Sequence, residues 1–262
     1  MRLRWSVLLL VVMTVSIGLA QAPTTTTVKA VGGDIVITAL GHASVQIEQG
    51  GKVIIVDPVT MMADLSRAKP ADLILVTDIH GDHYDAAAVA KLRKPGAPVV
   101  VPQAIADMKQ IPNPTVMANA TMRTNEQALA GITVIAVPAY NIQRGPAPGQ
   151  LYHPRGRGQG YVLAFTDKLA AVRQNQAGQV YVAGDTECVP AMTTWVTNVD
   201  VALMPMNLPY TMTPAEAAAC VKDFKPKVAI PYHYMGQKPE EFADALKGTM
   251  IEVRLLNWYS RS

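Results

Sequence analysis

The segment from Thr77 to His83 constrains the fold more than any other part of the sequence. It reads Thr-Asp-Ile-His-Gly-Asp-His and follows the apolar run at residues 73–76, which is typical of a buried strand. Two imidazoles and two carboxylates at the rigid end of a strand can bind a zinc-like ion and leave one position for water. The sequence therefore predicts a metal-binding loop and hydrolytic chemistry.

Two later segments place the same kinds of side chain after apolar runs. Asp185 follows residues 180–183, and His233 closes the segment that begins with the run 228–230. Each has an ordinary explanation, because Gly-Asp-Thr is common turn chemistry and a lone histidine after a strand is often only hydrogen-bonded. Together with the first loop, they predict one metal site built from distant parts of the chain.

The order of apolar runs predicts an α/β fold. Residues 34–40, 44–48 and 52–56 are typical of a strand meander, after which strands and helices alternate. We expect further strands at residues 99–101, 132–137, 161–165, 180–183, 201–204 and 228–230, and helices at residues 86–92, 103–109 and 214–224, with one more between the strands at 180–183 and 201–204. The helix at 214 is well marked, because Thr213 can cap it and Glu216 can bond back to the cap.

The N-terminus predicts export. Arg2 and Arg4 precede an apolar stretch that runs to Ala20, so we expect a signal peptide over residues 1–20, a flexible lead-in over 21–30 and one metallo-hydrolase domain over 31–262. A retained membrane anchor is the alternative if cleavage fails. The processed protein would be periplasmic or secreted, without a stable membrane span.

Charge and cysteine content exclude some classes of function. Removing residues 1–20 takes away two arginines and no acids, so the net charge falls from +3 to +1. A charge this close to zero gives no reason to expect a nucleic-acid partner. Cys188 and Cys220 either pair in an oxidising compartment or stay as buried thiols. The oligomeric state is not predicted.

Four short motifs accompany the metal-binding loop within residues 35–256. They are Leu40-Gly41-His42-Ala43-Ser44, Val56-Asp57-Pro58, Gly184-Asp185-Thr186 and Ile230-Pro231-Tyr232-His233. With them the chain resembles the metallo-β-lactamase superfamily, and within it the branch that contains L-ascorbate-6-phosphate lactonase. The resemblance implies an αβ/βα four-layer sandwich, with two facing mixed sheets, outer helices and two divalent metal ions at one edge.

The resemblance also implies a ligand set. Seven residues are the expected metal ligands: Asp78, His80, Asp82, His83, His153, Asp185 and His233. Asp82, His83 and His233 match the ligands of one ion, and Asp185 matches the carboxylate that bridges both; Asp82 and Asp185 are also the expected catalytic residues. Asp78 and Asn141 stand where the family has histidines, and His153 is the candidate replacement. Zinc is favoured, while the added carboxylate makes manganese or iron the alternatives.

Five further residues are expected to support the site. His42 and Asp57 would orient ligands through hydrogen bonds, the alternatives being a structural histidine and a capping turn before Pro58. Arg155, Asn207 and Tyr232 would contact the substrate, although a solvated arginine and a tyrosine that only fills a wall are the ordinary alternatives. Glu187 is expected to be a helix-start carboxylate.

These features predict an exported metal-dependent hydrolase that cleaves a lactone or phosphoester of a small molecule. The alternative is a metal-binding or ligand-sensing protein on the same fold that has lost turnover, which Asp78 and Asn141 motivate. Hydrolysis of a β-lactam ring is a third and weaker possibility.

Overall fold

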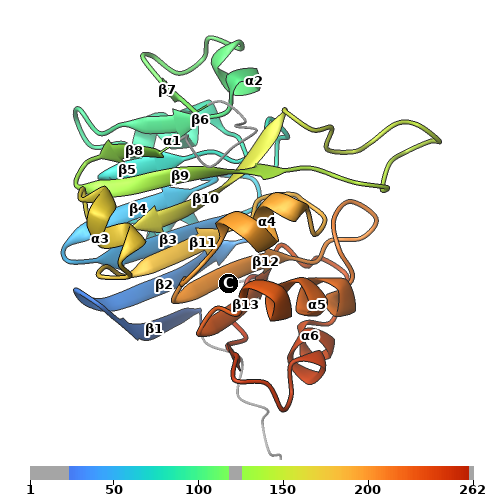
Figure 1. Ribbon diagram of the computed structural model, residues 1–262. Helices are drawn as coiled ribbons and strands as arrows, with labels where there is room; N and C mark the ends of the chain where they lie inside the picture. The colour runs from blue at the N-terminus through green and yellow to red at the C-terminus, as the bar shows by residue number, and fades with distance from the viewer. Residues whose placement is uncertain (1–23, 118–125, 260–262) are drawn as a thin grey trace, which may run out of the picture.

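The computed structural model describes residues 24–117 and 126–259 and contains two facing seven-stranded sheets (Figure 1). The first sheet follows sequence order: β1 (Thr25–Ala30), β2 (Gly33–Gly41), β3 (Ser44–Gln49), β4 (Lys52–Val56), β5 (Leu73–Leu75), β6 (Val99–Val101) and β7 (Thr115–Val116). The second comprises β8 (Glu126–Leu129), β9 (Ile132–Ala139), β10 (Gly158–Ala164), β11 (Gln179–Val182), β12 (Val201–Pro205), β13 (Val228–Tyr232) and β14 (Glu252–Val253), also in sequence order.

Both sheets are mixed. Strands β1 to β4 pair antiparallel and β4 to β7 pair parallel. The second sheet repeats this arrangement, antiparallel from β8 to β11 and parallel from β11 to β14. One core cluster contains residues of both sheets, and two others lie on the outer faces. The predicted four-layer sandwich is confirmed.

The helices cover the outer faces of the sheets. They are α1 (Ala86–Leu92), α2 (Gln103–Ala106), α3 (Leu169–Arg173), α4 (Pro190–Trp195), α5 (Pro214–Phe224) and α6 (Pro239–Ala245), with a short 3₁₀ turn, η1 (Leu65–Arg67). Helices α1 and α2 pack on the first sheet, and α4, α5 and α6 pack together on the second (Figure 1). None of the helices in the described ranges is long and apolar enough to cross a membrane.

The inner strands of both sheets, such as β5, β9 and β13, are buried on both faces, which explains why they appear as continuous apolar runs. In β4, Ile54 and Val56 belong to the core between the sheets, whereas Ile55 belongs to the outer core under α1 and α2. In β13, Ile230 and Tyr232 lie between the sheets and Ala229 lies under the helices. The alternation decides which strand residues can reach the edge of the sandwich.

Two expectations about local structure were wrong. Residues 21–30 were expected to form a flexible lead-in, but Thr25–Ala30 is strand β1, which pairs antiparallel with β2; its β-branched residues favour this extended form. The helix expected at 103–109 ends at Ala106, and Lys109 has a left-handed φ of 55° that a longer helix would not allow. The signal peptide expected over residues 1–20 lies outside the described residues.

Cys188 and Cys220 form a disulfide, so they are paired and are not buried thiols. It joins the segment before α4 to α5, and the two Cα atoms lie 5.7 Å apart. The bond therefore fixes one helix of the outer layer to the chain that leaves the end of β11.

A buried tyrosine links the two sheets directly below the Thr77–His83 loop. Tyr161 in β10 donates a hydrogen bond of 2.7 Å to the carbonyl oxygen of Val76, and Gln159 donates from its side chain to the same hydroxyl. The backbone N–H of Gln159 also donates to the carbonyl of Thr77 at 2.9 Å. These bonds fix the height of the loop relative to the second sheet.

We expect Tyr161→Phe to lower the free energy of unfolding by about 1–3 kcal/mol, because the carbonyl of Val76 would lose its buried partner. Tyr181→Phe is the matched control, since Tyr181 is equally buried but its hydroxyl has no hydrogen-bond partner among the described residues. Its removal should be neutral or stabilising. Urea unfolding of the metal-free proteins measures both values, and equal effects of the two substitutions would contradict the assigned role of Tyr161.

Candidate metal centre

The expected ligands meet at one edge of the sandwich, where the parallel strands end. The loop that contains His80 and His83 follows β5, Asp185 lies three residues beyond β11, and His233 directly follows β13. The carboxyl ends of parallel strands lie at the same edge of a sheet and commonly form binding sites. The structure therefore brings together segments that are 150 residues apart, the separation of His83 and His233.

Three residues at this edge have left-handed backbone conformations. The φ angles are 50° for His42, 50° for Asp57 and 47° for His233. The three residues directly follow strands β2, β4 and β13. A left-handed backbone is unfavourable for a residue with a Cβ atom. Such strain persists where the surroundings hold it, and it concentrates at functional sites.

Four side chains form what we call the inner cluster: Asp82, His83, Asp185 and His233. The Nε2 atom of His83 lies 3.3 Å from Oδ2 of Asp185, and Nε2 of His233 lies 3.3 Å from Oδ2 of Asp82. His233 Nε2 is also 3.7 Å from the other oxygen of Asp185. Two imidazoles and two carboxylates thus converge on one point.

A second group, the outer cluster, contains Asp78, His80 and His153. Their ligand atoms all lie within 4.8 Å of one another. The Nε2 atom of His153 is 3.0 Å from Oδ2 of Asp185, so Asp185 contacts imidazoles of both clusters. His153 therefore lies close to Asp78, as expected of a histidine that supplies an imidazole to this part of the site.

Unpartnered polar atoms show that this set of residues fits a metal ion. Nε2 of His83, both ring nitrogens of His233 and Oδ1 of Asp185 are buried without a hydrogen-bond partner among the described residues. Buried polar groups are normally hydrogen-bonded, so each of these atoms calls for an explanation. Imidazole nitrogens and carboxylate oxygens that face one another at 3–4 Å are the donors that divalent metals bind.

Asp57 orients His83 from below. Its Oδ2 accepts a hydrogen bond from Nδ1 of His83 at 2.8 Å, and its Oδ1 accepts one from the backbone N–H of Thr77 at 2.7 Å. This leaves Nε2 of His83 facing Asp185. Asp57 thus lies where the resemblance places it, and the capping turn before Pro58 does not account for these bonds.

The charges of the site are strongly coupled. Burial raises the pKa of Asp57, although His83 and Thr77 oppose the shift. Burial alone would lower the pKa of His83, but the carboxylates of Asp185 and Asp57 outweigh it and hold this pKa well above its usual value. Burial opposes ionisation of Asp185 as well, yet His233, His83 and His153 hold its pKa well below the usual range. The carboxylate of Asp185 is therefore ionised and needs cationic partners.

His42 is attached to the inner cluster rather than isolated in the core. Its Nε2 lies 3.1 Å from Oδ2 of Asp82, and its Nδ1 lies 3.1 Å from the hydroxyl of Tyr259. The ring packs against that of His233 at a centroid distance of 4.0 Å, with the two ring planes tilted by 41°. His42 therefore fixes the direction of the Asp82 carboxylate and also lies within ligand distance of the same point as Asp82 and His233.

The loop between β9 and β10 carries His153. Asn141 accepts hydrogen bonds from the backbone N–H and from Nδ1 of His153 at 2.7 and 2.8 Å, which turns Nε2 toward Asp185. Glu187 holds the loop in turn, because it accepts from the backbone N–H groups of Ile142, Gln143 and Arg144. Glu187 was wrongly expected to start a helix; its position two residues after Asp185 was the only signal of its role.

A cleft of about 720 Å³ opens onto both clusters. Its lining includes His80, Asp82, His153, Asp185, Asn207 and Tyr210. Asn207 therefore lies where it can meet a substrate. Tyr232 does not, because its side chain points into the core between the sheets, is fully buried and accepts a hydrogen bond from the N–H of Gly184. The expectation that Tyr232 contacts substrate was wrong.

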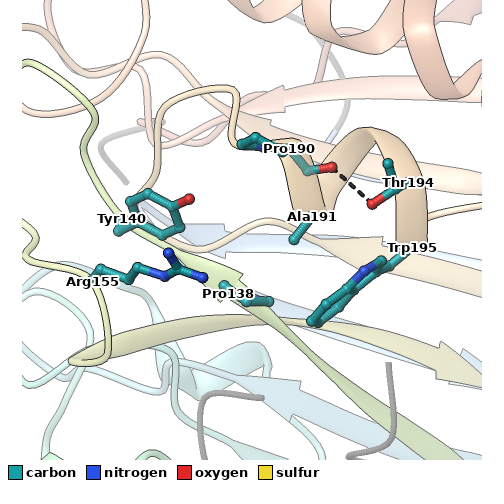
Figure 2. Close-up of a pocket in the computed structure, with 7 residues that line it drawn as sticks. All are labelled: Pro138, Tyr140, Arg155, Pro190, Ala191, Thr194 and Trp195. Atoms are coloured by element: carbon teal, nitrogen blue, oxygen red, sulfur yellow. Dashed lines mark hydrogen bonds between the residues drawn. The ribbon is translucent and has the colours of Figure 1, made fainter. Parts of the chain in front are cut away.

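Arg155 lies in a separate pocket of about 340 Å³, whose lining shares no residue with the metal cleft. Figure 2 shows its guanidinium group beside the ring of Tyr140, with Trp195 across the pocket; the guanidinium carbon is 5.4 Å from the ring centre. Arg155 was expected to contact the substrate, but it does not line the metal cleft.

A two-sheet sandwich with a His/Asp-rich edge defines the class of metallo-β-lactamase-like hydrolases, and the comparisons agree. Residues 36–233 match the β-lactamase superfamily domain. A UPF0173 metal-dependent hydrolase of Thermococcus onnurineus is 34% identical over 227 residues, which cover 83% of this chain and 94% of the relative. The chain therefore belongs to the UPF0173 metal-dependent hydrolase family of the metallo-β-lactamase superfamily.

Two solved structures share the architecture. A crystal structure from Parabacteroides distasonis, assigned as a metal-dependent hydrolase, is 35% identical with a TM-score of 0.74 and covers 88% of this chain and 97% of its own. The metallo-β-lactamase fold protein YhfI of Bacillus subtilis is 15% identical with a TM-score of 0.57, covers 88% of this chain and 94% of its own, and supports the fold alone.

We expect Glu187→Gln to loosen the loop that carries His153, because an amide NH₂ group would face backbone donors and the charge would be lost. Hydrogen exchange of residues 142–144, followed by mass spectrometry, should become faster in the metal-free protein. The free energy of unfolding should fall by about 1–3 kcal/mol. The exposed Glu240→Gln is the control; unchanged exchange in the Glu187 variant would show that another group holds the loop.

Proposed function

We propose that the protein is an exported hydrolase that cleaves an ester-like bond, a lactone or a phosphoester, in a small molecule. One observation carries the proposal: the buried carboxylate of Asp185 contacts His83 of the inner cluster at 3.3 Å and His153 of the outer cluster at 3.0 Å. A carboxylate shared in this way can bridge two divalent ions, as expected from the resemblance to the lactonase branch. The two clusters then act on one substrate bond.

The donor atoms suggest how the ions are distributed. The inner cluster, with two imidazoles and His42 nearby, favours zinc. The outer cluster adds the carboxylate of Asp78, which makes manganese or iron a suitable second ion. Bound there, divalent ions would act as Lewis acids and lower the pKa of a coordinated water.

The chain itself positions the reactants. Asp82 is the most open acid of the inner cluster, with a side chain 32% exposed. Although burial opposes it, the neighbouring imidazoles of His233 and His42 lower the pKa of Asp82, so its carboxylate stays ionised and can orient the attacking water. Asn207 and Tyr210 line the same cleft and can donate hydrogen bonds to the substrate oxygen that gains negative charge.

The rival proposal is a metal-binding or ligand-sensing protein without turnover. It is favoured by the outer cluster, where Arg157 Nε lies 3.4 Å from Oδ2 of Asp78 and competes for one of the ligand oxygens. Both proposals require bound metal, so turnover alone separates them.

We expect the purified mature protein to contain metal and to hydrolyse members of a panel of γ-lactones and phosphodiesters. Asp185→Asn should lose most of the bound metal and most of the hydrolytic activity, because the shared carboxylate would lose its charge. Asp57→Asn should weaken metal binding by about 10- to 100-fold through His83. Elemental analysis and hydrolysis rates measure these effects.

The exposed Asp244→Asn is the matched control for both carboxylate variants. Metal that is retained without turnover on either panel would favour the sensing protein. Nitrocefin turnover would instead indicate β-lactamase activity. Absence of metal would contradict both the hydrolase and the sensing protein.

Export is proposed on two grounds. The sequence of residues 1–20 has the composition of a signal peptide, and the Cys188–Cys220 disulfide is of the kind that persists in oxidising compartments. Expressed with its full N-terminus in a bacterium, the protein should be recovered from the periplasm or medium with Gln21 as its first residue. Recovery in the cytosolic fraction with residues 1–20 still attached would contradict export.

A further inference from the structure

We propose that the substrate carries an uncharged apolar arm, an alkyl or acyl chain, next to the bond that is cleaved. The arm would lie in what we call the methionine groove, lined by Met61, Met62, Tyr234, Met235, Trp258 and Tyr259. This inference rests on the proposed function and narrows its substrate class.

The groove is continuous with the metal cleft. The cleft of about 720 Å³ and the neighbouring cavity of about 620 Å³ share Met62, Met235 and Gly236 as lining residues. Tyr259 lines the groove and its hydroxyl contacts Nδ1 of His42, whose other nitrogen contacts Asp82. A ligand held at the inner cluster would therefore have its substituent at the mouth of the groove.

Exposed apolar side chains mark the same path. Met61 is 78% exposed and Met235 is 46% exposed, and Tyr210, at 42%, lines the cleft that the groove joins. Large apolar side chains left in water beside a reactive cleft are typical of ligand-binding surfaces. Methionine suits such a surface, because its flexible thioether adapts to varied apolar shapes.

The charges along the groove favour a neutral arm. Among the described residues that line it, Asp64 is the one charged side chain, and it is already paired with Arg67 at 3.0 Å. A phosphate or carboxylate at the far end would find no free cation on these walls, and an ammonium group would compete with Arg67 for Asp64. An aliphatic chain has neither requirement.

The test is a calorimetric titration of the zinc-loaded protein with acetate, butyrate, hexanoate and octanoate. These probes share one carboxylate and differ only in the length of the tail. We expect affinity to rise with each methylene by up to about fourfold, the effect of transferring one CH₂ group out of water. The Michaelis constant for γ-lactones should fall in parallel as their side chain lengthens, while kcat changes little.

Met62→Gln and Met235→Gln should flatten the dependence on chain length, since glutamine keeps the length of the side chain but makes the wall polar. Met250→Gln is the control, because Met250 is fully exposed and lines neither cavity. Circular dichroism checks that each variant is folded. An unchanged slope in both groove variants would overturn the assignment of the groove.

The two proposals can fail separately. If octanoate binds no tighter than acetate, or does not bind, the apolar arm is excluded even when lactones are hydrolysed. If affinity rises with chain length and the groove variants abolish the rise, but no lactone or phosphodiester is turned over, the groove stands and the proposed hydrolysis fails.

Discussion

The contact of Asp185 with two imidazoles is the interaction on which the rest of the site depends. An isolated carboxylate at this depth would be costly, and its charge is tolerated because His83, His153 and His233 surround it. Asp185 belongs to the second sheet and His83 to the first, so the contact requires the two sheets to meet at one height. The bonds from Tyr161 and Gln159 to the end of β5 fix that height.

The sequence predicted those site residues whose position follows from strand geometry alone. Asp82, His83, Asp185 and His233 each come shortly after a strand that is buried on both faces. Such strands appear as continuous apolar runs, and the carboxyl ends of parallel neighbours meet at one edge. The predicted convergence needed no knowledge of which strand lies beside which. The same reasoning predicted an α/β fold, whereas the four-layer sandwich was expected from the resemblance to the metallo-β-lactamase superfamily.

Residues whose side-chain direction depends on their neighbours were harder to predict. Tyr232 is adjacent to His233, but the alternation of β13 turns it into the core between the sheets, whereas the left-handed backbone at His233 ends the alternation. Arg155 lies two residues after His153 on the same loop, but its guanidinium group packs against Tyr140 in a separate pocket. Strand β1 was missed for a similar reason, because an edge strand is decided by its pairing with β2 rather than by its own pattern.

The surroundings of Asp78, which stands where the resemblance implies a histidine, suit a carboxylate. A carboxylate in place of an imidazole adds a negative charge to a buried cluster, and Arg157 lies 3.4 Å from it. Arg157 is itself held by the carbonyl of Tyr152 at 2.7 Å. A side chain at position 158 would place its Cβ atom 2.6 Å from Oδ2 of Asp78, so Gly158 leaves the room that the carboxylate occupies.

His153 completes the exchange at the outer cluster. It comes from the same loop as Arg157. Asn141, which stands where the resemblance implies another histidine, accepts hydrogen bonds from His153 and turns its Nε2 toward Asp185. The outer cluster thus contains two imidazoles and a carboxylate with a compensating cation close by. The loop between β9 and β10 therefore supplies both the imidazole of His153 and the cation of Arg157, which makes the geometry of this one loop decisive for the charge balance and the ligand set of the outer cluster.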